Sequence, residues 1–148
     1  MLELGVLVEK LDMDQKSLDI INSLNVATDN NELCPIVFFL EYGAQPKTCL
    51  FAKMQAEEVY CYSHPVIDTD IKTAELLIEC PLPTKKFLYL WDMDWLYSPE
   101  KFGIYNKVFQ SMDIITRCKS HSELVKQCWL KDNYIIEDFN YVELQRLF

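Results

Sequence analysis

Glycine and arginine are both scarce in this 148-residue sequence. The three glycines, Gly5, Gly43 and Gly103, lie too far apart to form a G-x-G-x-x-G motif or a P-loop. The standard glycine-rich sites for dinucleotides and nucleoside triphosphates are therefore excluded. The two arginines, Arg117 and Arg146, leave any anion site few guanidinium groups to use.

Positive charge is scarce as a whole, since 14 Lys and Arg residues face 23 Asp and Glu residues, for a net charge of -9. Grooves for nucleic acids neutralise phosphates with clustered basic residues, so we expect no nucleic-acid partner. No run of the sequence approaches the ~20 apolar residues of a membrane-spanning helix, and the first residues lack the basic start of a secretory signal. We therefore expect a cytoplasmic protein without a membrane partner.

The six cysteines form no C-x-x-C pair, and each lies in or beside an apolar run. We expect free, buried thiols in a reducing compartment rather than a disulfide framework. Because the chain has only two histidines, a structural zinc site has little support.

Half of the residues are apolar, and short apolar runs alternate with segments of helical spacing. Six strands are predicted, over residues 4–8, 35–40, 58–62, 86–91, 113–116 and 134–136. Helices are predicted from Asp12 or Asp14, over 47–56, from Asp70, after Ser98, after Ser120 and over 141–148. This alternation is typical of a mainly parallel sheet with helices on both faces. We therefore predict a single Rossmann-like α/β domain over residues 1–148, with a sheet of about six strands.

Capping and breaking residues set several of the predicted boundaries. Asp12 is predicted to cap the first helix, and the polar stretch 25–33 to form the loop that follows it. Pro81 and Pro83 are predicted to end the third helix. Asn140 is a predicted cap for the last one.

The loop after the fifth predicted strand is the strongest candidate for ligand binding, because ligands of open parallel sheets lie beyond the carboxyl ends of the strands. The loop combines Arg117, Lys119, Ser120 and His121, and Ser120 forms an S-x-x-E capping box with Glu123. Free amides at a helix start favour a phosphate or carboxylate, and Arg117 or Lys119 would add charge. The alternative is that Ser120 only caps the helix and Arg117 pairs with an acid.

Two carboxylates, Asp92 and Asp94, follow the fourth predicted strand. This spacing can direct both side chains to a magnesium or manganese ion that bridges substrate phosphates. The motif resembles the Asp-x-Asp motif of GT-A-type glycosyltransferases. It also resembles the nucleophile motif of haloacid-dehalogenase-like phosphatases, from which Trp95 departs. A metal-dependent transferase or phosphohydrolase is thus an alternative function. Otherwise Asp92 ends the strand, and Asp94 caps the next turn or is solvated there.

The C-terminal part of the chain resembles a βαβ unit of GT-B-type glycosyltransferases. The resemblance is carried by Asp-Ile-Ile-Thr-Arg at 113–117, Ser-His-Ser-Glu-Leu at 120–124 and Tyr-Ile-Ile-Glu-Asp-Phe at 134–139. Members of that family have two Rossmann-like domains, and the nucleotide-sugar binds in the cleft between them. The resemblance therefore implies a stand-alone half whose cleft would be completed by a homodimer or a partner domain.

The favoured interpretation is a Rossmann-like domain that binds a nucleotide, phosphate or sugar near Arg117 and Ser120. A non-catalytic interaction or oligomerisation module is a further alternative, because aromatic residues gather near the end of the fourth predicted strand. The motifs leave enzymatic activity open.

Overall fold

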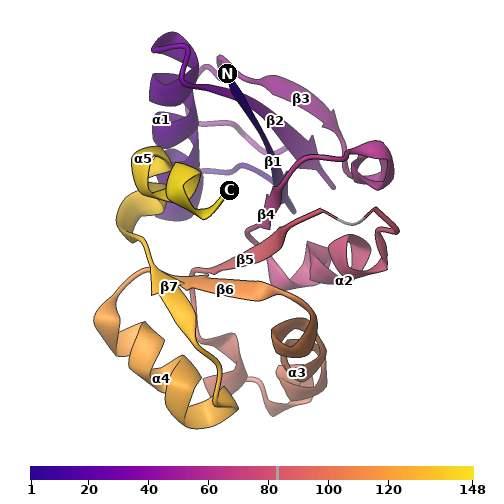
Figure 1. Cartoon of the computed structure of the whole chain (residues 1–148), viewed down its shortest axis with the longest axis vertical. Coiled ribbons are helices and arrows are strands. Elements are labelled where there is room, and N and C mark those ends of the chain that lie inside the picture. Colours follow the sequence, from indigo (N-terminus) through magenta and orange to yellow (C-terminus); the bar gives the residue numbers. More distant parts are fainter. Residues whose placement is uncertain (83) are drawn as a thin grey trace.

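The computed structural model describes residues 1–82 and 84–148, which form an α/β fold around one sheet whose strands all pair in parallel (Figure 1). The seven strands are β1 (Leu2–Val8), β2 (Leu33–Phe39), β3 (Ala52–Gln55), β4 (Val66–Asp68), β5 (Lys86–Leu90), β6 (Asp113–Thr116) and β7 (Asn133–Ile135). Their order in the sheet is β3-β2-β1-β4-β5-β6-β7. The predicted Rossmann-like α/β fold with a parallel sheet is confirmed, with one strand more than expected.

Helices cover both faces of this sheet. The α-helices are α1 (Gln15–Asp29), α2 (Ile71–Glu79), α3 (Phe102–Ser111), α4 (Lys119–Trp129) and α5 (Tyr141–Leu144). Short 3-10 helices are η1 (Ala56–Cys61), η2 (Asp94–Leu96), η3 (Pro99–Lys101), η4 (Glu137–Phe139) and η5 (Gln145–Leu147). Buried residues of α1, η4 and α5 pack on one face, and those of η1, α2, α3 and α4 pack on the other.

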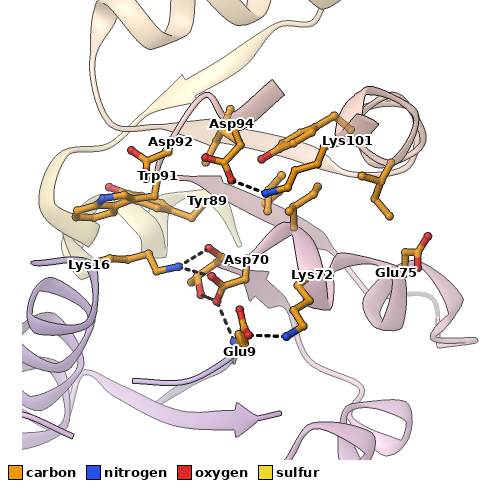
Figure 2. A pocket seen from close by; sticks show the side chains of 16 residues that line it. Glu9, Lys16, Asp70, Lys72, Glu75, Tyr89, Trp91, Asp92, Asp94 and Lys101 are labelled. Carbon is orange, nitrogen blue, oxygen red and sulfur yellow. Dashed lines mark hydrogen bonds and ion pairs between the residues drawn. The ribbon is translucent and has the colours of Figure 1, made fainter. Parts of the chain in front are cut away.

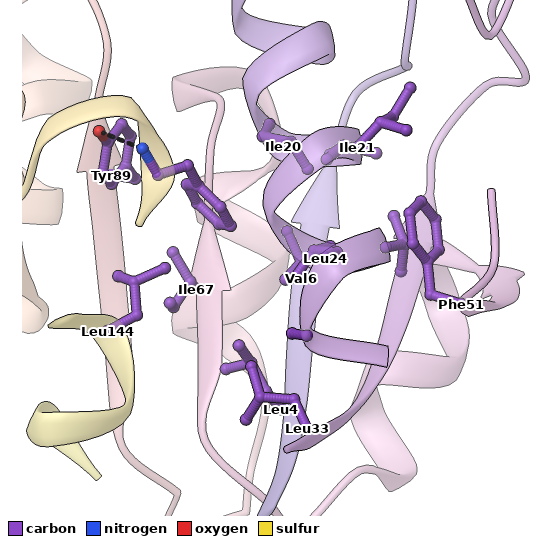
Figure 3. Close-up of a cluster of buried hydrophobic side chains, with 14 of the residues drawn as sticks. Leu4, Val6, Ile20, Ile21, Leu24, Leu33, Phe51, Ile67, Tyr89 and Leu144 are labelled. Carbon is purple, nitrogen blue, oxygen red and sulfur yellow. Dashed lines mark hydrogen bonds between the residues drawn. The ribbon is translucent and has the colours of Figure 1, made fainter. Parts of the chain in front are cut away.

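The central strand β1 sends apolar side chains to both faces, as expected for a strand covered on both sides. Leu4 and Val6 pack under α1, against Ile20 and Leu24, in the cluster shown in Figure 3. Leu7, on the alternate side of the strand, belongs to the second cluster, under α2 and η1. The sheet therefore lies between two separate apolar layers.

The C-terminal segment closes the part of the first face that α1 does not cover. The Tyr89 hydroxyl on β5 donates a 2.6 Å hydrogen bond to the Ile136 carbonyl and accepts one of 3.1 Å from the Phe139 amide. Asp138 and Phe139 have φ angles of 51° and 54°, in the left-handed region. Since non-glycine residues seldom adopt this conformation, burial of Phe139 and its bond to Tyr89 hold the turn in place.

Two predicted boundaries around the first helix are wrong. The helix continues through most of the stretch 25–33, to Asp29, because Ala27 is buried and extends its apolar face. Its cap is Asp14, whose carboxylate accepts from the Ser17 amide at 2.7 Å, whereas the carboxylate of Asp12 accepts from the Met13 amide. The end at Pro81 is confirmed, Pro83 lies outside the described residues, and Asn140 caps α5 as predicted.

Two predicted elements in the middle of the chain are also wrong. The helix expected over 47–56 is instead a loop that leads into the edge strand β3, whose four side chains are all exposed. The strand expected over 58–62 is mostly the 3-10 helix η1, in which Val59 faces the core. The buried strand of this region is β4, three residues long and missed by the pattern of apolar residues.

The cysteines are all free, as expected, but only Cys80 is buried. Cys34, Cys61 and Cys128 are exposed, so the expectation of buried thiols is wrong for these three. An apolar neighbourhood in the sequence did not predict burial here, because neighbouring positions of a strand or helix point in different directions.

No helix in the described part of the chain combines the length and apolar character that crossing a membrane requires.

Replacing Tyr89 with phenylalanine tests the anchor of the C-terminal segment. The Tyr89→Phe variant removes one hydroxyl and leaves the Ile136 carbonyl and the Phe139 amide without their partner, which should lower the free energy of unfolding by about 2 kcal/mol. Urea denaturation measures the change. The control is Tyr134→Phe on the exposed edge strand β7, expected to change it by less than about 0.5 kcal/mol. Equal losses in both variants would contradict the anchoring role.

Candidate functional site

The strand order reverses between β1 and β4, and a cavity lies beyond the carboxyl ends of β4 and β5 beside this point. The chain leaves β1 towards β2 on one face and leaves β4 towards β5 on the other, so the two connections diverge there. The cavity has a volume of about 470 Å³, within the usual range for ligand sites. Its lining is Glu9, Lys16, Thr69, Asp70, Ile71, Lys72, Glu75, Leu88, Tyr89, Leu90, Trp91, Asp92, Asp94, Lys101, Ile104 and Tyr105 (Figure 2). We call this cavity the crevice.

Asp70 joins the two sides of the crevice. One of its carboxylate oxygens accepts from the Glu9 backbone amide, just after β1, at 2.9 Å and from the Thr69 hydroxyl at 3.1 Å. Its other oxygen pairs with the Lys16 ammonium on the first turn of α1 (Figure 2). Both side chains of this ion pair are less than one-fifth exposed, so the pair is only partly screened by water.

Other ion pairs surround the same cavity. Glu9 and Lys72 are 2.7 Å apart, and Asp94 and Lys101 are 3.5 Å apart. The lining contains five acids and three lysines, so its own charge is negative. Each of the five acids has a basic partner, and two of these partners, Lys107 and Arg117, lie outside the lining. Paired carboxylates keep free lone pairs, which can accept hydrogen bonds from hydroxyl groups.

Trp91 forms the side of the crevice nearest to β6, and Arg117 holds it there. The Arg117 guanidinium carbon lies 4.1 Å from the centre of the Trp91 ring, and its Nε donates to the Trp91 carbonyl at 2.9 Å. A terminal nitrogen of Arg117 is 3.9 Å from Asp92. The loops after β5 and β6 are therefore adjacent, as the pairing of these strands requires.

The four residues predicted to bind an anion lie beside the crevice rather than in its lining. Arg117 contacts the crevice through Trp91, whereas Lys119 and Ser120 are exposed at the start of α4. His121 is half-buried, and its pKa is lowered by burial and by the neighbouring Arg117 charge. An imidazole of lowered pKa is neutral at pH 7, so His121 adds no charge there.

The expected capping box does not form. The helix α4 begins at Lys119 with Cys118 in the cap position and without a side-chain cap, and Ser120 lies inside the first turn. The Ser120 hydroxyl is instead 3.1 Å from the Cys118 sulfur. This hydrogen bond, with the backbone amide of His121, lowers the pKa of the Cys118 thiol. Among the described residues, the only side-chain acceptor at the start of α4 is thus the Cys118 sulfur, which accepts hydrogen bonds weakly, so the first amides of the helix can still donate to a ligand.

Asp92 and Asp94 both line the crevice, but each faces its own cation. Asp94 pairs with Lys101, and Asp92 lies near Arg117. Among the described residues there is no group of three acids, histidines or cysteines that could hold a metal ion. A magnesium or manganese ion bound to the aspartates alone would therefore need further ligands from a substrate.

The residues at the centre of the site are difficult to predict from the sequence. Lys16 lies in no recognisable motif, and the sequence pattern predicts Asp70 only as the start of a helix. The available signal was the acidic stretch 68–70 directly after a strand, since polar residues at the carboxyl end of a parallel strand are often functional. The stretch alone does not indicate that Glu9 and Lys16 are the hydrogen-bond partners of Asp70.

Asp68 lies directly beneath this region and is completely buried. Its Oδ1 accepts from the Thr73 hydroxyl at 2.7 Å and from the Asp70 amide at 3.0 Å, whereas within the described residues Oδ2 has no partner. Burial raises the pKa of Asp68 to about 8, against the opposing effect of these hydrogen bonds. The carboxyl is therefore protonated at neutral pH and adds no charge beside Asp70.

In comparisons with known proteins, the chain matches no family, no curated protein and no solved structure at a significant level.

Replacing Asp68 with asparagine tests the buried acid. In the unfolded chain the carboxyl loses its proton near pH 4, but in the folded chain only near pH 8, so the folded state binds the extra proton between these values. Stability should then fall as pH rises from about 4 to about 8, by up to about 1.4 kcal/mol per pH unit. Asp68→Asn should remove this slope in urea denaturation measured across the pH range.

The matched control is Asp113→Asn, because Asp113 is exposed at the start of β6. It should keep the slope of the wild-type protein. Identical pH profiles for the wild-type and Asp68→Asn proteins would show that Asp68 does not carry the proton.

Proposed function

We propose that this Rossmann-like chain binds a sugar or nucleotide-sugar, with the sugar in the crevice and a phosphate group at the loop after β6. The observation that carries this proposal is the cavity of about 470 Å³ at the reversal of strand order, where open parallel sheets bind their ligands. Its position supports a ligand site independently of any family resemblance.

The lining of the crevice favours a ligand rich in hydroxyl groups over a bare anion. Its charge is negative, which disfavours a phosphate, but its carboxylates are arranged around the cavity as hydrogen-bond acceptors. Trp91 adds an aromatic side chain against which the apolar face of a sugar ring can pack. Acceptors combined with an aromatic ring suit a sugar.

The start of α4 is the better position for the phosphate of such a ligand. Arg117 uses its Nε on the Trp91 carbonyl and keeps further N–H donors on its terminal nitrogens. Lys119 and Ser120 are exposed beside it, and the first turn of α4 has amides whose only side-chain acceptor in the described part of the chain is the weakly accepting Cys118 sulfur. The resemblance of residues 113–139 to a GT-B βαβ unit supports the same arrangement, because that family binds nucleotide-sugars.

The first test is thermal denaturation and calorimetry with UDP, UDP-sugars, inorganic phosphate and free monosaccharides. UDP-sugars should raise the melting temperature of the wild-type protein more than phosphate or a monosaccharide alone, since they would occupy both parts of the site. Arg117→Ala should weaken UDP-sugar binding at least about tenfold, because it removes a charge-assisted contact and the support of Trp91.

Two further variants separate the causes of that loss. Arg146→Ala removes the other arginine, which is exposed in the C-terminal segment, and should bind as the wild-type protein does. Arg117→Lys keeps the charge but not the planar stacking on Trp91, so it should recover only part of the affinity. If none of these compounds changes the melting temperature of the wild-type protein, the proposed function is wrong.

A further inference from the structure

The carboxylate of Asp70 is bound in the way that Rossmann-like proteins bind a phosphate. Such folds hold an anion between the loop after the first strand and the start of the first helix. Here the donors from this region are the Glu9 amide, just after β1, and the Lys16 ammonium on the first turn of α1. Both donate to Asp70, which comes from the other side of the strand reversal (Figure 2).

The orientation of Asp70 shows that this contact is not a by-product of helix capping. Asp70 occupies the cap position of α2, where an aspartate commonly accepts from the first amides of its own helix. Its side chain makes no such bond and points across the crevice to Glu9 and Lys16 instead. The Thr69 hydroxyl, from the same loop, lies 3.1 Å from both this carboxylate and the Leu7 carbonyl and shares its one proton between them.

We propose that Asp70 is a specificity-determining residue that fills the anion position of the crevice from within the chain. Its two oxygens take the donors that a phosphate would need, and its negative charge repels a second anion. The crevice therefore excludes phosphate and accepts the uncharged, hydroxyl-bearing part of a ligand. The placement of the ligand, with its sugar in the crevice and its phosphate at Arg117, rests on the proposed function. The claim that Asp70 fills the anion position does not.

Removing Asp70 should uncover a phosphate site, and the test is designed so that binding at the loop after β6 does not mask it. The Arg117→Ala variant and the Arg117→Ala/Asp70→Ala double variant are titrated with inorganic phosphate, with ionic strength matched by sodium chloride. Phosphate should raise the melting temperature of the double variant by about 3 °C and leave the single variant unchanged. In NMR spectra, the Glu9 amide should shift on titration only in the double variant.

Two controls define the site. Adding Lys16→Ala to the double variant should abolish the gained response, since the ammonium would be the main charge on the phosphate. Replacing Glu75 instead of Asp70 with alanine removes an acid of the same lining and should produce no phosphate response. If phosphate raised the melting temperature of the Glu75→Ala variant by the same amount, the loss of any negative charge in the crevice would explain the effect. That result would overturn the proposal.

A second variant keeps the test decisive if Asp70→Ala does not fold. Asp70→Ser keeps a helix-capping residue at the start of α2, but its side chain is too short to occupy the anion position, so phosphate should shift the Glu9 amide in that background too. An unmoved Glu9 amide in a folded Asp70 variant would overturn the proposal. A shift of the Glu9 amide already present with Asp70 intact would overturn it as well. Neither result depends on whether UDP-sugars bind the wild-type protein.

Discussion

The reversal of strand order between β1 and β4 is the constraint on which the site depends. Because α1 leaves on one face of the sheet and α2 on the other, no helix lies across the carboxyl ends of these two strands. The polar groups exposed there need partners, and Asp70 supplies them across the gap. The same contact that closes the fold at this point thus shapes the crevice beside it.

A second consequence of the reversal is that the face under α1 would be bare over β4 and β5. The chain covers it with η4 and α5, which return from the far edge of the sheet after β7. Tyr89 makes this return specific, because its buried hydroxyl satisfies one carbonyl and one amide of the returning segment. The fold is therefore completed by a tertiary contact rather than by another crossover helix.

The sequence predicted those parts whose signal is local. Continuous apolar runs predict β2 and β5, which are covered on both faces. They do not predict β3, whose four side chains are exposed, or β4, which has only three residues. The place of Asp92 and Asp94 at the end of a strand follows directly from the sequence, because they come just after an apolar run. The ion pair of Lys16 and Asp70 joins positions 54 residues apart and depends on the order of the strands, which alternation alone does not determine.

The scarcity of glycine and the excess of acidic residues have a common consequence at the crevice, where a carboxylate occupies the place of a bound phosphate. A glycine-rich loop binds phosphate because its backbone amides approach the ligand closely, and this chain has no such loop. In this chain the Asp70 carboxylate already accepts from the Glu9 amide. No ligand has to come close to that part of the backbone, so the loop after β1 does not need glycine. Arg117 is the guanidinium nearest to the crevice, and it contacts the lining through Trp91 and Asp92. If the proposed phosphate drew Arg117 towards it, one face of the Trp91 ring would be released, and occupancy at the loop after β6 would then change the shape of the crevice through Trp91.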